Sequence, residues 1–313
     1  MASGRYRVFM KKYYELTGDP SIDSQLQGAL SALKMGQILS WIAVLSILLA
    51  GVWGTHLVYA SNPEELGLSL LPLIAAFIGA ASVRGFLRKT FSASLLPTVA
   101  KAVGFEYSHT FHGVQDLLDT GLLPSGRVVR SEDSLKSDFG SVSVSSRDIH
   151  ITTGGDEPKT LFAGLAISLK HPENRNSLVV TTEERTRSGR FRKPLVGIRN
   201  FIETARKKCP QGEEFRAFSS NREKANDHGF EPYLENILRL NAELPNCRLF
   251  SLVRSWDETH VALSYDGNPM KLGGLFVTRS KLQEQVLEAV STMQLVLQAV
   301  QVVLEAEAAE KLG

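Results

Sequence analysis

The chain has 313 residues, with 35 Lys and Arg against 33 Asp and Glu, and a formal net charge of +2 at pH 7. A charge this close to zero gives no general case for nucleic-acid binding, so nucleic acid is not expected among the partners. Cys209 and Cys247 lie far apart without CxxC spacing, which indicates neither a disulfide framework nor a zinc site. We expect both thiols to be buried or idle in a reducing cytoplasm.

Residues 1–34 predict a polar cytosolic arm. Gly18 to Ser21 breaks the arm, and apolar residues then fall at helical spacing: Ile22, Leu26, Leu30 and Leu33. This spacing predicts a short amphipathic helix leading into the next segment. Its apolar face has two candidate positions, the bilayer surface or the soluble domain.

Two long apolar runs follow within residues 35–89. No Asp, Glu, Lys or Arg occurs from Met35 to Pro63 or from Leu66 to Val83. A hydrocarbon core about 30 Å thick takes about 20 apolar residues as a helix, so both runs are long enough to cross it. The sequence therefore predicts a transmembrane helical hairpin, with the membrane lipid bilayer as a partner.

Basic residues flank the hairpin and predict its orientation. Arg5, Arg7, Lys11, Lys12 and Lys34 precede it, and Arg84, Arg88 and Lys89 follow the second run. The loop between the runs carries Glu64 and Glu65 but no basic residue. We therefore expect both termini on the cytoplasmic side. A cleaved signal peptide is the competing interpretation of the first run, but the long preceding segment and the second run argue against it.

Small residues recur at every fourth position in each run: Ser46, Ala50 and Gly54, then Ala75, Gly79 and Val83. Such spacing allows two helix backbones to approach closely. We expect packing within the hairpin.

Residues 90–313 predict one cytosolic α+β domain with a mainly antiparallel sheet and covering helices. A helix from Phe91 to Val103, with a kink at Pro97, and a short one ending near Gly121 come first. Strand patterns follow at Val142–Val144, Ile149–Ile151, Thr160–Leu169, Leu178–Thr181, Phe215–Ser219 and Leu275–Val277, and Arg248–Ser255 with Thr259–Tyr265 forms a hairpin. The intervals are too short for helical crossovers. Gly164 within its strand indicates a bulge or a close backbone contact.

Two helices are predicted to cover this sheet. The first runs from Phe230 to Leu244 with one apolar face. The last runs from about Ser280 to Glu310, and its apolar residues step by four and three, as in a heptad seam: Leu282, Val286, Ala289, Met293, Val296, Val300 and Val303. Coiled-coil assembly is one interpretation. Leu287, Val290, Leu297 and Leu304 widen the stripe and favour the other, in which the helix covers the sheet. We expect the tail around Glu305, Glu307 and Glu310 to be frayed and exposed.

A basic run lies between Arg185 and Lys208, with nine basic residues against one acid, Glu203. Most such runs are solvated faces. Beside an anionic leaflet, however, each nearby base is worth about 1 kcal/mol. Anionic headgroups are therefore candidate ligands, and the candidate contact residues are Arg185, Arg187, Arg190, Arg192 and Lys193.

The order of the elements resembles a known family. Gly121–Leu123, Ser131–Asp133, Phe139–Gly140, Phe162–Leu165 and Glu214–Ser219, with the paired membrane helices and the terminal helix, resemble the bacterial domain-of-unknown-function family 3137. Ser131 stands where the family has a glycine. The resemblance implies a multi-pass protein of the bacterial inner (cytoplasmic) membrane with a cytosolic α+β domain, and it implies no reaction.

No catalytic or cofactor motif is found: there is no P-loop, GxSxG, HExxH or GxGxxG pattern. No catalytic, cofactor-binding or metal-binding residue is therefore predicted. Glu132, Asp133 and His150 are the least arbitrary candidates for a dispersed catalytic set, and His109 with His112 is a nominal metal pair. We expect a membrane-anchored interaction or scaffold protein that contacts another protein or a second copy. The alternative is an enzyme or small-ligand sensor with its site in a cleft of the α+β domain.

Overall fold

The computed structural model describes residues 22–61, 70–109, 114–173, 176–182, 201–209, 212–220, 230–244, 247–265, 270, 272 and 278–312. The chain forms two compact units. The first comprises Met1–Val103 and Pro269–Ser291, and the second comprises Gly104–Asn268 and Thr292–Gly313. The last helix, α11 (Arg279–Leu312), contributes to both. The predicted division at residues 34 and 89 stays a prediction.

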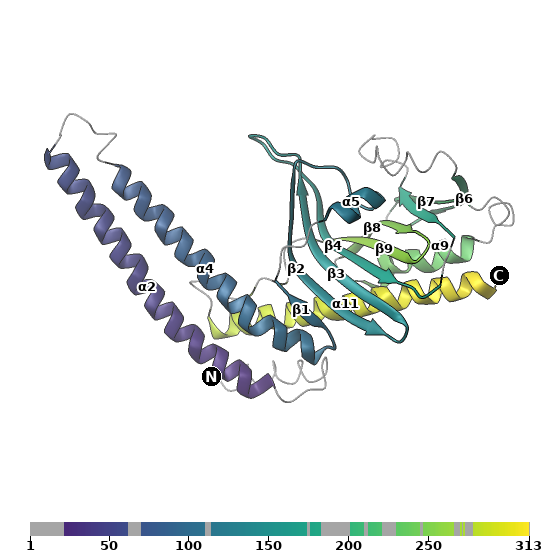
Figure 1. Ribbon diagram of the computed structural model, residues 1–313, viewed down its shortest axis with the longest axis horizontal. Coiled ribbons are helices and arrows are strands. Elements are labelled where there is room, and N and C mark those ends of the chain that lie inside the picture. The colour runs from purple at the N-terminus through teal and green to yellow at the C-terminus, as the bar shows by residue number, and fades with distance from the viewer. Residues whose placement is uncertain are drawn as a thin grey trace. The chain divides into compact units, whose positions relative to one another are not determined.

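The first unit contains two long helices, α2 (Ile22–Ser61) and α4 (Leu71–Ala102), which lie side by side (Figure 1). A Cβ added at Gly51 would lie 2.5 Å from the Ala76 Cβ, and one added at Gly54 would lie 3.1 Å from the Pro72 Cβ. Gly79 faces Ile47 in the same way, at 3.4 Å. The small residues thus allow close packing within the hairpin, as predicted. Pro97 lies inside α4, which also confirms that this helix continues past the second apolar run.

The second unit is built on an antiparallel sheet. Its strands are β1 (Glu106–Ser108), β2 (Val128–Phe139), β3 (Val142–Thr152), β4 (Thr160–Lys170), β5 (Leu178–Thr182), β6 (Ile202–Lys208), β7 (Glu214–Ser219), β8 (Cys247–Arg254) and β9 (Glu258–Tyr265). They form a 9-stranded sheet in the order β1-β2-β3-β4-β9-β8-β5-β7-β6. Every pairing between these strands is antiparallel. The predicted α+β class with an antiparallel sheet is confirmed.

Helices cover both faces of this sheet (Figure 1). On one face, α5 (Gln115–Thr120) and its flanks pack on Ile149, Phe162 and Ala262. On the other lie α9 (Glu231–Leu238), α10 (Leu240–Glu243) and the part of α11 from Thr292 onward. Thr259 of β9 contacts Glu307 of α11, whereas Ala262 of the same strand packs in the cluster around α5. Adjacent strand residues point to opposite faces, so residues three apart do as well. The sheet is therefore a middle layer.

The heptad positions of α11 are buried within the chain. Leu282, Val286, Ala289, Met293, Val296, Val300 and Val303 are at most 1% exposed. A side chain covered by its own chain is not available to a second helix, so the structure favours a core helix over a coiled coil. The adjacent Leu287, Leu297 and Leu304 are half-buried, which confirms the wide stripe.

Gly164 is a close backbone contact, as its place in a strand indicated. A Cβ there would lie 2.0 Å from the Leu263 carbonyl oxygen of the neighbouring strand β9. Any larger side chain would push β4 and β9 apart.

The strands β1, β2 and β6 were not predicted. β2 has a polar sequence in which Ser131, Asp133 and Leu135 are buried, and the buried polar groups hide the alternation that marks a strand. β6 lies inside the basic run, where charge conceals the pattern. The strand predicted at residues 275–277 lies outside the described residues.

Candidate functional site

The exposed apolar surface is concentrated on α2 and α4. Leu49, Trp53 and Ile78 are 69%, 68% and 64% exposed, and thirteen further large apolar side chains there are also exposed: Met35, Ile38, Leu39, Trp41, Ile42, Leu45, Val52, Leu57, Tyr59, Leu70, Leu71, Ile74 and Phe77. In the described part of the chain, Ile202 and Trp256 alone are large, apolar and exposed elsewhere. Lys34–Ala60 of α2 is also long and apolar enough to cross a membrane. The hairpin is therefore a candidate membrane anchor.

Three polar side chains of this hairpin bond to its own backbone. Ser40 Oγ donates to the Gly36 carbonyl at 2.6 Å, and Thr55 Oγ1 donates to the Gly51 carbonyl at 2.9 Å. Ser82 Oγ donates to the Ile78 carbonyl at 2.9 Å. Such i to i−4 bonds satisfy hydroxyl groups without water. These hydroxyls suit a medium that offers no hydrogen bonds.

The basic run divides into two parts. The candidate headgroup contacts Arg185, Arg187, Arg190, Arg192 and Lys193 lie outside the described residues. In β6, Arg206 Nη2 lies 2.7 Å from Glu203 Oε1, and Lys207 Nζ lies 2.5 Å from Glu235 Oε1. These two bases are paired with acids of the second unit.

The structure does not bring the dispersed catalytic candidates together. Buried Asp133 accepts hydrogen bonds from Tyr107 Oη at 2.5 Å and pairs with His109 Nδ1 at 3.0 Å. Burial, and then the bond to Asp133, raises the pKa of Tyr107. His150 is exposed, and its Nε2 lies 3.5 Å from Thr160 Oγ1, while Glu132 is half-buried.

The nominal metal pair is not assembled among the described residues. His112 lies outside them, and within them no group of three His, Cys, Asp or Glu residues could hold a metal ion. Cys209 and Cys247 are free and buried, as predicted. Burial raises the pKa of the Cys247 thiol to about 11, which makes it unreactive at neutral pH.

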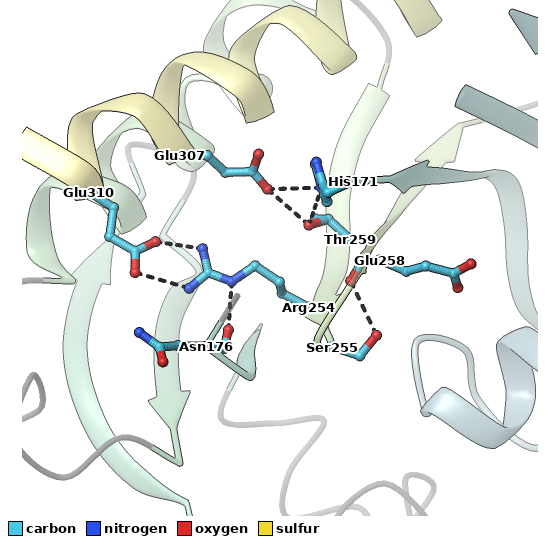
Figure 2. Close-up of polar contacts among 8 residues, drawn as sticks. All are labelled: His171, Asn176, Arg254, Ser255, Glu258, Thr259, Glu307 and Glu310. Carbon is cyan, nitrogen blue, oxygen red and sulfur yellow. Dashed lines mark hydrogen bonds and ion pairs between the residues drawn. The ribbon is translucent and has the colours of Figure 1, made fainter. Parts of the chain in front are cut away.

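A buried polar cluster at the end of α11 was not predicted (Figure 2). Arg254, at the end of β8, forms a two-bond ion pair with Glu310, at 2.5 and 3.1 Å. Its Nε donates to the Asn176 carbonyl at 2.8 Å, and its guanidinium carbon lies 5.0 Å from the Tyr233 ring centroid. The side chains of Arg254 and Glu310 are 2% and 9% exposed.

Glu307 forms the second half of the cluster. It accepts a hydrogen bond from Thr259 Oγ1 at 2.9 Å and lies 3.4 Å from His171 Nε2. His171 Nε2 and Thr259 Oγ1 are 3.0 Å apart. These groups are sealed from solvent, so a substrate has no access to them and the cluster fixes α11 to the sheet.

The expectation of a frayed tail was wrong for Glu307 and Glu310. Both are covered because they face the sheet, while Glu305 on the outer side is exposed and pairs with Arg239 at 2.9 Å. Isolated acids near a chain end give no sign of a cation 56 residues away in sequence. The signal that could have found them is Arg254 at the end of an apolar strand.

No protein-family model matches the chain, and no curated protein matches it. The resemblance to family 3137 therefore stays a prediction. Among solved structures, the chain is similar to the crystal structure of the mycobacterial trehalose monomycolate transport factor A, TtfA, with 12% sequence identity and a TM-score of 0.31. The match covers 64% of this chain and 90% of that chain. A score this low does not indicate a shared fold.

Proposed function

We propose that the chain is a membrane-anchored interaction or scaffold protein of the bacterial inner membrane. The exposed apolar surface of α2 and α4 carries this proposal. Soluble monomers rarely expose contiguous apolar patches above a few hundred Å², and larger ones mark membrane or protein contacts. Each large apolar side chain moved out of water contributes about 1.5–3 kcal/mol.

The dimensions of α2 support a full span. Lys34–Ala60 contains 27 residues. At about 1.5 Å rise per residue they extend about 40 Å, which exceeds a hydrocarbon core of about 30 Å. The helix therefore crosses with a tilt, or with its ends among the headgroups.

The basic flanks support an orientation with both termini cytoplasmic. Lys34 precedes the first apolar run, and Arg84, Arg88 and Lys89 follow the second run, while Glu64 and Glu65 lie between the two runs. The loop then lies outside, and the second unit lies in the cytoplasm.

Alkaline washing of membranes and reporter fusions test the anchor. The wild-type chain should stay in the membrane pellet, and a phosphatase fused after residue 63 should be active while one fused at residue 313 should not. Replacing Leu45 and Leu49 by Asp should release the chain, since an Asp at the helix centre costs about 2.5–3.5 kcal/mol of insertion. Release of the unmodified chain, or a reporter active only at residue 313, would contradict the proposal.

Trp256 supports an interaction role for the second unit. It is 68% exposed at the β8–β9 turn. The turn is held by Ser255 N, which donates to the Glu258 carbonyl at 2.8 Å, and by His171 N, which donates to the Asp257 carbonyl at 2.7 Å. A rigidly presented tryptophan is the residue type most enriched at interface hot spots.

A photo-crosslinking residue in place of Trp256 tests this role in native membranes. We expect a discrete product with a protein partner or a second copy. The matched control is the same residue at exposed Lys136, on a different part of the sheet. Equal labelling from the two positions would argue against an interface at Trp256.

The basic residues 185–193 are proposed to contact anionic headgroups. The full-length chain in nanodiscs with and without anionic lipid allows the test, with chymotryptic cleavage after Phe191 in this segment as the readout. Anionic lipid should protect the segment at low salt, and protection should fade near 0.5 M, where the screening length is roughly 4 Å.

Charge reversal distinguishes this contact from a general charge effect. Arg187→Glu, Arg190→Glu and Arg192→Glu together should abolish the protection. Arg206→Glu, at a base that is ion-paired with Glu203, should leave it unchanged. Equal cleavage in neutral and anionic discs would show that the charges form a solvated face.

A further inference from the structure

β9 carries a hydroxyl–imidazole–carboxylate cluster on each face. Thr259 belongs to the buried polar cluster at the end of α11, and the adjacent His260 points to the opposite face. There Ser168 Oγ lies 2.8 Å from His260 Nδ1, and His260 Nε2 lies 3.2 Å from Glu258 Oε2. Figure 2 shows the Glu258 side chain pointing away from the buried polar cluster.

The strand register holds this second cluster in place. Ser168 and His260 are directly opposite each other in the β4–β9 pairing, and Lys170 is opposite Glu258. Paired residues share a face, so no loop movement is needed to assemble the contact. The arrangement is therefore built into the central strands of the sheet.

The side chains of Ser168, His260 and Glu258 differ in how far they are exposed to solvent. Ser168 is half-buried, the His260 side chain is 6% exposed, and the Glu258 side chain is 39% exposed. The imidazole is therefore more covered than the serine and the carboxylate on either side of it. Burial lowers the pKa of His260, which favours a neutral imidazole at neutral pH.

A neutral imidazole has one donor and one acceptor nitrogen. Nε2–H donating to Glu258 leaves Nδ1 as the acceptor for the Ser168 hydroxyl. This is the order of roles by which a base activates a serine. From this geometry we propose that Ser168 is a nucleophile toward small activated esters, with His260 as its base and Glu258 as the residue that orients His260.

The chemical step balances with water as the co-reactant. Ser168 Oγ bonds to the ester carbonyl carbon while its proton passes to His260 Nδ1. The bond to the alcohol oxygen then breaks, and the alcohol leaves with that proton. Water attacks the acyl-serine with His260 again taking a proton, which returns to Ser168 Oγ as the acid is released.

Two donors lie on the same face as Ser168. Ser145 is opposite it in the β3–β4 register, and Lys170 lies two residues further along β4. A hydroxyl and an ammonium thus lie on the face from which an ester would approach Ser168, and such donors stabilise the charge that the carbonyl oxygen gains.

The test uses the full-length chain in detergent with a fluorophosphonate probe, followed by mass spectrometry of the labelled peptide. We expect the label on Ser168, and none there in Ser168→Ala. His260→Gln should slow labelling by about 100-fold or more, and Glu258→Gln by about tenfold. The rate of p-nitrophenyl acetate hydrolysis should fall most in Ser168→Ala, less in His260→Gln and least in Glu258→Gln.

Ser143→Ala is the matched control, because Ser143 is an exposed serine on the same face and should not affect labelling. The wild-type measurement decides without any variant that might misfold. Absence of label from wild-type Ser168, or equal labelling of Ser143 and Ser168, would overturn the proposal while leaving the membrane anchor untouched.

Discussion

Helices α2 and α11 have similar composition but opposite surroundings. Both contain a stretch long and apolar enough to cross a membrane, yet in an apolar 18-residue part of each, 17% is buried for Lys34–Ala60 and 56% for Ser280–Glu310. α11 places Glu284, Glu288 and other polar residues on one side and apolar residues on the other, whereas the apolar stretch of α2 shows no such sides. Length and apolarity therefore do not separate a core helix from a candidate membrane helix, whereas the distribution of polar residues around the helix separates α11 from α2.

The largest expected effect comes from introducing one Asp into an apolar position of each helix. Val296→Asp buries a carboxylate in the second unit, where Val296 is fully covered, and should destabilise it by more than about 4 kcal/mol. Leu49→Asp should leave the stability of that unit unchanged and weaken membrane retention. Thermal unfolding in detergent and alkaline washing measure the two outcomes. A large loss of stability from Leu49→Asp would show that α2 belongs to a folded core.

Removing one partner of the buried ion pair should have the next largest effect. Arg254→Met leaves Glu310 buried without its cation, which should cost about 3–5 kcal/mol. Replacing both residues by Met should recover most of this loss, since an apolar pair needs no compensating charge. Denaturant unfolding of the two variants provides the comparison. Equal losses would mean that the packing of the Arg254 stem matters more than its charge.

Gly164→Ala tests the close contact between strands β4 and β9. The new Cβ would collide with the Leu263 carbonyl, and the resulting shift of β4 should cost about 1–3 kcal/mol. Ala163→Gly, one residue earlier, changes the same strand in the opposite direction and should cost about 0.5–1 kcal/mol. Thermal unfolding is sufficient to rank them. A neutral Gly164→Ala would show that the two strands separate freely.

The smallest expected effect lies in α2. Gly51→Val forces α2 away from α4 and should weaken their pairing by about 1–2 kcal/mol. Gly28→Ala, where nothing lies within 4 Å, should stabilise the same helix by up to about 1 kcal/mol. Cysteine crosslinking between positions 47 and 79, which face each other, reports the pairing. Unchanged crosslinking in Gly51→Val would contradict the close approach.

Periodicity predicted those elements whose apolar residues carry the pattern. The stripe of α11 and the alternation in β3 and β4 were readable because apolar residues occupy the buried positions. β2 was not, because Asp133 and Ser134 are buried with hydrogen bonds instead of apolar contacts. For long-range polar contacts the sequence can mark one partner, as Arg254 at the end of an apolar strand does, but it does not identify the other. Arg254 and Glu310, or Ser168 and His260, meet only because strand order and helix placement bring them together.

The two edge strands of the sheet, β1 and β6, affect how closely copies of the chain can be packed together without their sheets joining. β1 has three residues, and β6 carries Arg206, Lys207 and Lys208 with a bulge between Glu203 and Ala205. Short, charged and bulged edges resist pairing with another sheet. Copies anchored in one membrane meet at far higher local concentration than free ones. With the proposed membrane anchor, such edges would let many copies share a small area of membrane without joining into continuous sheets.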